Sequence, residues 1–410
     1  MAHVFSDRMI VAIDVGTTKI CVLVAQKLCD DQMTILGIGK APSEGLKKGI
    51  VVNIGQTVQS IKLAVKEAEL MSGMTITSAY VGISGSHIHS INSQGAVPIK
   101  RGVVRMQDIS NVISAAQAIP IPEGQHILHV LPQYFVVDNQ ERVNDPIGMH
   151  GVRLEVMTHI ITGATALVAD LVSCCEQAGV DVRDVILEPI ASAAAVLTPD
   201  EQELGAGILD IGGGTSDFAV YQHGTIRHTK VVPIAGTQFT RDIAIGLRTT
   251  LDDAERIKRE YGAADLSCIE KDTMIDAACI QGSERQMISQ EYAVSILNAR
   301  AQELLEFIKR DIDTFDIVSS MSAGLVLTGG GALLRGLDTL AQNMFHMPVR
   351  IGMPKINFDM PVTLKSPIYA TGYGLLLSAL AKGTSRTNSS QEPFVKRMLS
   401  SMKSWVSDFF

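Results

Sequence analysis

The chain contains one short pattern twice, as VAIDVGTT at residues 11–18 and as ILDIGGGT at residues 208–215. Each copy has an apolar strand with an Asp at its end, then a turn of Gly and Thr, and a second apolar strand follows. A single turn of this kind is typical of an ordinary hairpin. Two copies, both with Thr, predict two similar domains that face each other across a cleft.

The residues of the two turns suit phosphate binding. Glycines let backbone N–H groups approach phosphate oxygens, and Thr hydroxyls add donors. The Asp side chains would repel phosphate, but they can hold the water shell of Mg²⁺, which prefers oxygen ligands. We therefore predict a joint site for phosphate and Mg²⁺ that is built from Asp14, Gly16, Thr17, Thr18 and Lys19 together with Asp210, Gly212, Gly213, Gly214 and Thr215.

A third glycine-rich turn occupies residues 328–331, directly after the apolar residues 325–327. Its glycines, Gly329, Gly330 and Gly331, would let a flat base or ribose lie against the backbone. A plain turn before a helix explains them equally well. The sequence has neither a G-x-x-x-x-G-K-[ST] loop nor a G-x-G-x-x-G after a strand, so the other common phosphate motifs are absent.

Composition limits the possible functions. The 410 residues suggest two to four domains, and the net charge of -8 with 5% aromatic residues argues against a nucleic-acid binder. The six cysteines form no C-x-x-C pair, which is typical of a reducing cytosol, and no histidine pattern indicates a structural metal. We expect neither a transmembrane helix nor a secretory signal, because no long apolar run occurs.

The last residues form an amphipathic pattern. Residues 382–391 are polar and predict a flexible linker, and residues 392–410 predict a membrane-targeting helix that folds on contact with lipid. At helical spacing, one face collects all the large apolar side chains: Phe394, Val395, Met398, Leu399, Met402, Trp405, Val406, Phe409 and Phe410. The other face carries three basic residues and one acid, which suits an anionic leaflet. Docking on the protein's own core or on a partner is the alternative.

Taken in order, the motifs resemble those of the actin, Hsp70 and sugar-kinase superfamily. That superfamily has a first phosphate loop, a connecting segment, a second phosphate loop, an adenosine loop and a second connection. The matching residues are 14–19, 188–193, 209–217, 328–331 and 370–372.

Within this superfamily the chain is similar to the FtsA family of bacterial cell-division proteins. The similarity rests on DPIGMHGVRLE at residues 145–155, on Thr240-x-Asp242-Ile243 and on AERIK at residues 254–258. It implies an α/β, actin-like ATPase fold of two facing domains, each with an inserted subdomain, plus the C-terminal amphipathic helix. The implied parts are a first domain (1–83, 163–206 and 366–381), its insertion (84–162), a second domain (207–226 and 317–365) and its mostly helical insertion (227–316).

The resemblance also implies roles for single residues. Asp14 and Asp210 would organise the Mg²⁺ of a bound ATP. Glu255 and Lys258 would meet ribose and base, although a surface ion pair also explains their spacing. Glu188 would position the attacking water, although it could simply cap a strand end before Pro189. Because the family varies at this position, we expect weak ATP hydrolysis.

The function implied by the resemblance is a membrane tether. The protein would assemble into filaments at the division septum, on the cytoplasmic face of the bacterial inner membrane. It would bind the C-terminal peptide of the ring protein FtsZ, with Arg300 as a candidate for its carboxylates, and would help recruit other division proteins. A small-molecule kinase would have no use for residues 392–410. An Hsp70-like chaperone needs a peptide-binding domain, and a shape-determining actin relative would lack residues 145–155.

Overall fold

Two sheets with the same design form the centre of the molecule. The computed structural model describes residues 9–29, 32–280, 285–355 and 361–381. The first sheet has the order β10-β6-β1-β2-β3 and the second the order β13-β12-β11-β16-β17. The strands of the first are β1 (Met9–Val15), β2 (Lys19–Cys29), β3 (Gln32–Pro42), β6 (Ser78–Ile83) and β10 (Asp181–Leu187). Those of the second are β11 (Ala206–Ile211), β12 (Ser216–Gln222), β13 (Thr225–Val232), β16 (Leu325–Thr328) and β17 (Val349–Ile351).

The strand directions match as well. In each sheet the first two strands form an antiparallel hairpin that continues antiparallel into the third, whereas the other two strands pair in parallel. The repeat seen in two short stretches of sequence therefore extends over two whole sheets, and the predicted pair of similar domains is confirmed.

Helices cover the first sheet and fill the space between the two sheets. Helix α2 (Ile54–Ser72) packs on β3 and β2, beside α4 (Thr165–Gln177). Its apolar residues recur at helical spacing and are buried, and Gly73 ends it at φ +68°, a left-handed conformation that favours glycine. Helices α5 (Glu188–Val196) and α11 (Ala370–Ala381) share one apolar core with strands of both sheets. No helix in the described ranges has the length and apolarity to cross a bilayer.

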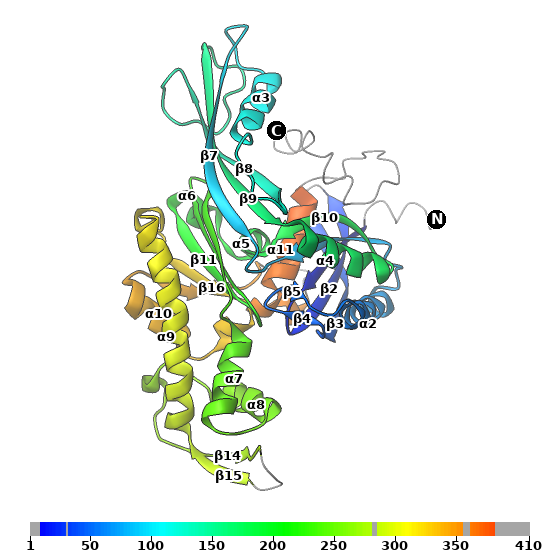
Figure 1. The fold of residues 1–410 in the computed structure, drawn as a ribbon, viewed down its shortest axis with the longest axis vertical. Helices are drawn as coiled ribbons and strands as arrows, with labels where there is room; N and C mark the ends of the chain where they lie inside the picture. Colours follow the sequence, from blue (N-terminus) through cyan, green and yellow to red (C-terminus); the bar gives the residue numbers. More distant parts are fainter. Residues whose placement is uncertain (1–8, 30–31, 281–284, 356–360, 382–410) are drawn as a thin grey trace.

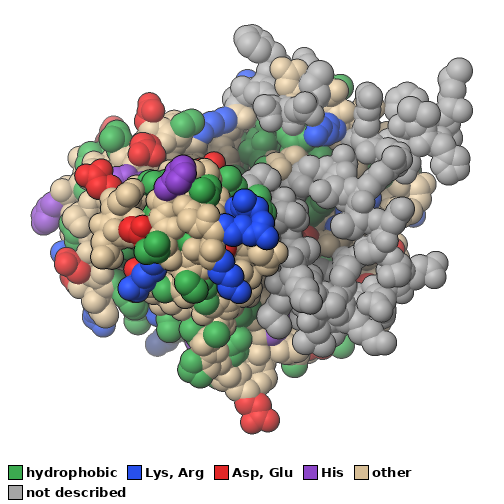
Figure 2. Space-filling model, turned by 90° about the horizontal axis from the view of Figure 1, so that it is seen from above, with side chains coloured by type: hydrophobic (Ala, Val, Ile, Leu, Met, Phe, Trp, Pro, Cys, Tyr) green, Lys and Arg blue, Asp and Glu red, His purple; other side chains and the backbone are tan. Residues whose placement is uncertain are grey.

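A separate subdomain is inserted after β6 and projects at the top of Figure 1. It consists of the sheet β7-β9-β8 and helix α3, with an apolar core of its own. Its elements are β7 (His89–Pro98), α3 (Met106–Ala116), β8 (Gln125–Val137) and β9 (Arg153–Ala164). Figure 2 looks down on this end of the molecule, where acidic and basic side chains are interspersed over the described surface.

The second insertion is helical but contains a small ribbon. Figure 1 shows α7, α8 and the ribbon at the lower end, with the long helix α9 beside them. The elements are α7 (Gly236–Gly246), α8 (Leu251–Tyr261), β14 (Met274–Ala278), β15 (Arg285–Ser289) and α9 (Gln290–Thr314). The remaining elements are β4 (Leu46–Lys47), β5 (Ile50–Val51), α6 (Pro199–Leu204) and α10 (Leu337–Phe345).

One expected boundary differs from the structure. The helical insertion was expected to begin at residue 227, but residues 225–232 form β13 and pair with β12 in the second sheet. The strand is hard to recognise because its centre, Arg227 to Lys230, is polar. These side chains are polar because they meet polar groups on both faces: Thr229 contacts the inserted subdomain, and His228 contacts Asp311 of α9.

Candidate functional site

The two predicted hairpins close with the same hydrogen bond. The Gly16 N–H donates to the Lys19 carbonyl at 3.1 Å, and the Gly212 N–H donates to the Thr215 carbonyl at 2.9 Å. In each hairpin the Asp at the end of the first strand lies opposite a residue of the second strand: Asp14 faces Cys21, and Asp210 faces Asp217. The sequence repeat thus reflects a repeated turn geometry.

The tips of the hairpins touch each other. A Cβ atom on Gly213 would lie 2.5 Å from the Thr18 hydroxyl, and one on Gly214 would lie 2.3 Å from the Thr17 hydroxyl. Because real Cβ atoms do not approach so closely, only glycine allows this contact. The Thr17 hydroxyl also accepts a hydrogen bond of 3.0 Å from the Gly49 N–H. The structure therefore brings the two halves of the predicted phosphate site together.

Four acidic side chains gather beneath the hairpins. Asp14 ends β1, Asp210 and Asp217 face each other on β11 and β12, and Glu188 begins α5. The three Asp side chains are buried and Glu188 is partly buried. Helix α5 starts here because Pro189 fits its first turn, where an acidic residue is also favoured. The charges of Asp14, Asp210 and Asp217 act on Glu188, so this side chain lies near the acids of both hairpins.

Burial raises the pKa of each of these acids. It raises the pKa of Asp14 to about 6, against the attraction of Lys19 and with the repulsion of Asp210. It raises the pKa of Asp217 to about 7, although a hydrogen bond from Ser84 opposes the rise. Burial, then the charges of Asp14 and Asp217, hold the pKa of Glu188 well above its usual range. Such a cluster of acids is better satisfied when a cation lies near it.

Asp210 is fixed by groups from three other elements. Its carboxylate accepts hydrogen bonds from Ser192 of α5 and from Thr371 of α11, the latter at 2.9 Å. A Cβ atom on Gly329 would lie 2.2 Å from the Asp210 carboxylate, and Gly329 has φ +81°. The third glycine-rich turn therefore lies directly against Asp210, and a Cβ on Gly331 would likewise meet Ile211 at 2.3 Å.

Lys19 is a cation of the first hairpin whose charge acts on this cluster. Its charge opposes the rise that burial causes in the pKa of Asp14 and of Asp210. Its ammonium group donates to the Ile368 carbonyl at 2.8 Å and lies 5.0 Å from the centre of the Tyr369 ring. Lys19 therefore connects the first hairpin to the segment that leads into α11.

Glu255 and Lys258 lie beside the second hairpin. The Lys258 ammonium group is 2.6 Å from the Glu255 carboxylate and donates to the Gly236 carbonyl at 3.1 Å. The Gly236 N–H in turn donates to the Gly212 carbonyl at 3.0 Å. The two residues do form an ion pair, and that pair is attached to the hairpin, so the structure brings them into the site.

Arg300 lies away from this site. Its guanidinium group contacts Asp242 of α7 with two nitrogens, at 2.5 and 3.1 Å, and also contacts Glu303. The side chain is 26% exposed. The carboxylates that Arg300 contacts in this structure are therefore those of its own subdomain, and its role toward a partner's carboxylates stays a prediction.

Several members of the site were not expected from the sequence. Asp217 takes the place that Cys21 has in the first hairpin, so the repeat gave no sign of it. Ser84, Ser192 and Thr371 come from three separate elements, and only the fold places their hydroxyls on the acids. A sign was present for Ser192, Thr371 and Asp217, because all three lie inside segments that resemble motifs of the superfamily.

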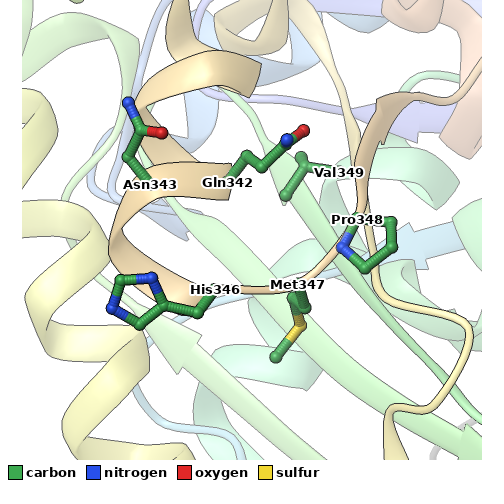
Figure 3. A pocket seen from close by; sticks show the side chains of 6 residues that line it. All are labelled: Gln342, Asn343, His346, Met347, Pro348 and Val349. Carbon is green, nitrogen blue, oxygen red and sulfur yellow. The ribbon is translucent and has the colours of Figure 1, made fainter.

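Among the described residues, neither a cluster of metal ligands nor the open pocket beside α10 coincides with the candidate site. In the described part of the chain, no group of three or more His, Cys, Asp or Glu residues is arranged to hold a metal ion. An open pocket of about 520 Å³ is lined by the end of α10 and the start of β17, and none of the candidate residues lines it (Figure 3). Residues 382–410, with the predicted linker and membrane helix, lie outside the described residues.

Comparison with known proteins agrees with this architecture. The family model "Cell division protein FtsA" matches residues 207–374, and "SHS2 domain inserted in FTSA" matches residues 85–162. The cell division protein FtsA of Pseudomonas aeruginosa is 43% identical over 418 residues, which cover 100% of both chains.

Solved structures share the fold at low sequence identity. The PilM-PilN type IV pilus biogenesis complex matches with a TM-score of 0.66 and 18% identity, over 90% of this chain and 98% of that one. MreB5 of Spiroplasma citri bound to ADP matches with a TM-score of 0.54 and 16% identity, over 90% and 94%. The expected actin-like fold is thus confirmed. Together with the near-complete match to the Pseudomonas protein, these findings show that the chain belongs to the FtsA family of actin-like cell-division proteins.

Proposed function

We propose that this chain binds ATP with Mg²⁺ between its two hairpins. The observation that carries the proposal is the contact of the hairpin tips above four acids. The tips supply backbone N–H groups and the hydroxyls of Thr17 and Thr18, which are donors for phosphate oxygens. The MreB5 neighbour, which shares the fold, is bound to ADP, and this supports a nucleotide as the ligand.

The acids suit a magnesium ion that keeps most of its water. Asp14 and Asp210 approach from opposite hairpins, and their oxygens would accept hydrogen bonds from the ion's water shell. An ion bound in this way needs no cluster of direct protein ligands. Its charge, when present, would stabilise the ionised forms of the acids around it. Glu255 and Lys258 on one side, and Gly329, Gly330 and Gly331 on the other, would enclose the nucleoside.

Glu188 supports slow hydrolysis rather than rapid turnover. A general base must be ionised to accept a proton from water. Burial and the neighbouring Asp charges keep the pKa of Glu188 high, which disfavours its ionised form, and the charge of a bound Mg²⁺ would oppose this effect only in part. We therefore infer that bound ATP acts chiefly as a switch between assembly states.

In cell division the protein would link a filament to a membrane. Membership of the FtsA family supports a place at the septum, and the apolar face of residues 394–410 supports attachment to the cytoplasmic side of the membrane. The chain would assemble with copies of itself, bind the C-terminal peptide of FtsZ and help recruit later division proteins. Arg300 would serve that binding by holding α9 against α7.

Calorimetric titration of ATP with Mg²⁺ tests the nucleotide site. Gly214→Ala places a Cβ against Thr17 and separates the hairpins, so we expect at least about tenfold weaker binding, equivalent to the loss of one hydrogen bond. Gly55→Ala is the matched control. It adds the same methyl group to α2, where the nearest atom is 3.6 Å away, and should leave ATP affinity unchanged. Equal affinity in wild type and Gly214→Ala would contradict the proposal.

A further inference from the structure

The inserted subdomain belongs to the first domain in sequence but contacts the second domain. Its strands β7, β8 and β9 pack against β13, the outer strand of the second sheet. The contact is made by polar groups, of which Gln133, His159 and Thr229 are buried, Ser90 is half-buried and Asn92 is exposed. The His159 ring lies 2.9 Å from the Thr229 hydroxyl, and the Ser90 hydroxyl donates to the Thr229 carbonyl at 3.0 Å.

Two amide side chains complete this contact. The Asn92 side-chain oxygen lies 2.7 Å from the other ring nitrogen of His159, and the Gln133 amide donates to the Ile226 carbonyl of β13 at 2.9 Å. The His159 side chain is only 1% exposed. Since the Asn92 oxygen can only accept, the His159 Nδ1 carries the proton, and its Nε2 accepts from the Thr229 hydroxyl. We call Asn92, Gln133, His159 and Thr229 the polar latch.

The polar latch lies close to the nucleotide site through the second sheet. Thr229 pairs with Ala219 of β12, and Val231, two residues further along β13, pairs with Asp217. Asp217 accepts a 2.6 Å hydrogen bond from Ser84, which directly follows β6 at the root of the inserted subdomain. The second domain therefore contacts the inserted subdomain at two points. Asp217 of β12 contacts Ser84 at the root of the subdomain, and Thr229 of the neighbouring strand β13 contacts His159 in the subdomain's sheet.

This arrangement has a mechanical consequence. The inserted subdomain is covalently continuous with the first domain, so a change in the angle between the two domains must move it relative to β13. Buried hydrogen bonds resist such movement, because separating them leaves polar groups without partners. We propose that the polar latch transmits occupancy of the nucleotide site to the inserted subdomain and so sets the orientation of the surface that it presents. The proposal rests on the function proposed above.

Amide hydrogen exchange of the whole chain, measured by mass spectrometry with and without Mg²⁺ and ATP, tests the proposal. In the wild type we expect ATP to slow exchange in residues 208–217 and also in β7 and β8. Thr229→Val keeps the shape of the side chain but removes the hydroxyl. This variant should bind ATP like the wild type, and ATP should still slow amide exchange in residues 208–217. In β7 and β8, by contrast, the amides should exchange about tenfold faster than in the ATP-bound wild type.

Two controls separate this role from general loosening. Thr229→Ser retains a hydroxyl and should restore the effect of ATP on β7 and β8. Ser93→Ala removes a hydroxyl from the same strand as Asn92, but that hydroxyl donates to the Ala116 carbonyl inside the inserted subdomain. Its response to ATP should match the wild type.

The outcomes are distinct. If ATP neither binds nor affects residues 208–217 in the wild type, the proposed nucleotide site and this inference both fail. If ATP protects residues 208–217 but leaves β7 and β8 unchanged, the inference fails and the nucleotide site stands. Full protection of β7 and β8 in Thr229→Val would also overturn it, because the Thr229 hydroxyl would then play no part in the transmission.

Discussion

Asp14 and Asp217 retain their protons at a pH where an exposed carboxyl group is ionised, because both are buried near other acids. The cause is physical and local: removal from water penalises the charged form, and the acids repel one another. Burying several carboxyl groups side by side does not stabilise the fold at neutral pH, because their ionised forms are disfavoured there. Their placement under two hairpins suits the Mg²⁺ proposed above.

These pKa values predict how stability depends on pH. The pKa of Asp14 is raised from 3.8 to about 6 and that of Asp217 from 3.8 to about 7, so the folded protein binds more protons than the unfolded chain between these values. Their contribution to stability is therefore present below about pH 4 and is lost as the pH rises to 7.

Urea denaturation without nucleotide at pH 5, 6 and 7 measures this dependence. We expect Asp217→Asn, which has no proton to lose, to be less sensitive to pH than the wild type. Mg²⁺ with ATP should raise the stability of the wild type most at pH 7, where the acids are ionised. Equal slopes with pH in the wild type and in Asp217→Asn would show that burial does not perturb Asp217.

The sequence predicted part of this site for a clear reason. Asp14, Asp210 and the glycines are adjacent in two copies of one turn, so their common function is visible in the chain. Ser84 and Asp217 are hydrogen-bonded but lie 133 positions apart, and no local pattern connects them. Residues that act through packing between distant elements become visible only in the fold.

At the scale of elements, periodicity was a good guide where one face is apolar. Helix α2 is an example, because its buried apolar residues recur at helical spacing and Gly73 ends it. Strand β13 was missed because polar residues fill its centre and both of its faces meet polar partners.

The contact between α9 and α7 gives an element-scale prediction. Arg300 and Asp242 form a two-nitrogen ion pair, and their side chains are 26% and 24% exposed. We expect Arg300→Ala and Asp242→Ala each to lower the free energy of unfolding by roughly 1–2 kcal/mol, because a charge-assisted pair is lost.

A double-mutant cycle shows whether the two residues act together. The double variant should cost about 1 kcal/mol less than the sum of the single variants. Arg310→Ala is a suitable control, since its pair with Glu306 is largely exposed and should contribute little. Additive effects of Arg300→Ala and Asp242→Ala would mean that Arg300 does not hold α9 against α7.

At the scale of the whole molecule, the fold explains how one chain could serve as a tether. The two sheets and their hairpins would bind the nucleotide, and the inserted subdomain contacts both domains. Residues 392–410 would provide a weak membrane anchor. One such anchor binds a membrane weakly, but many anchors on one filament act together, so assembly would strengthen attachment.

Co-sedimentation with anionic vesicles in the presence of Mg²⁺ and ATP tests the tether most directly. The whole chain is compared with a chain that ends at Gln391 and with a chain carrying Trp405→Glu, which places a charge on the apolar face. We predict that only the whole chain pellets with the vesicles, and that it does so less at high salt. If the whole chain stays in solution, or if the shortened chain pellets equally well, residues 392–410 are not the membrane anchor and the account of a tether is contradicted.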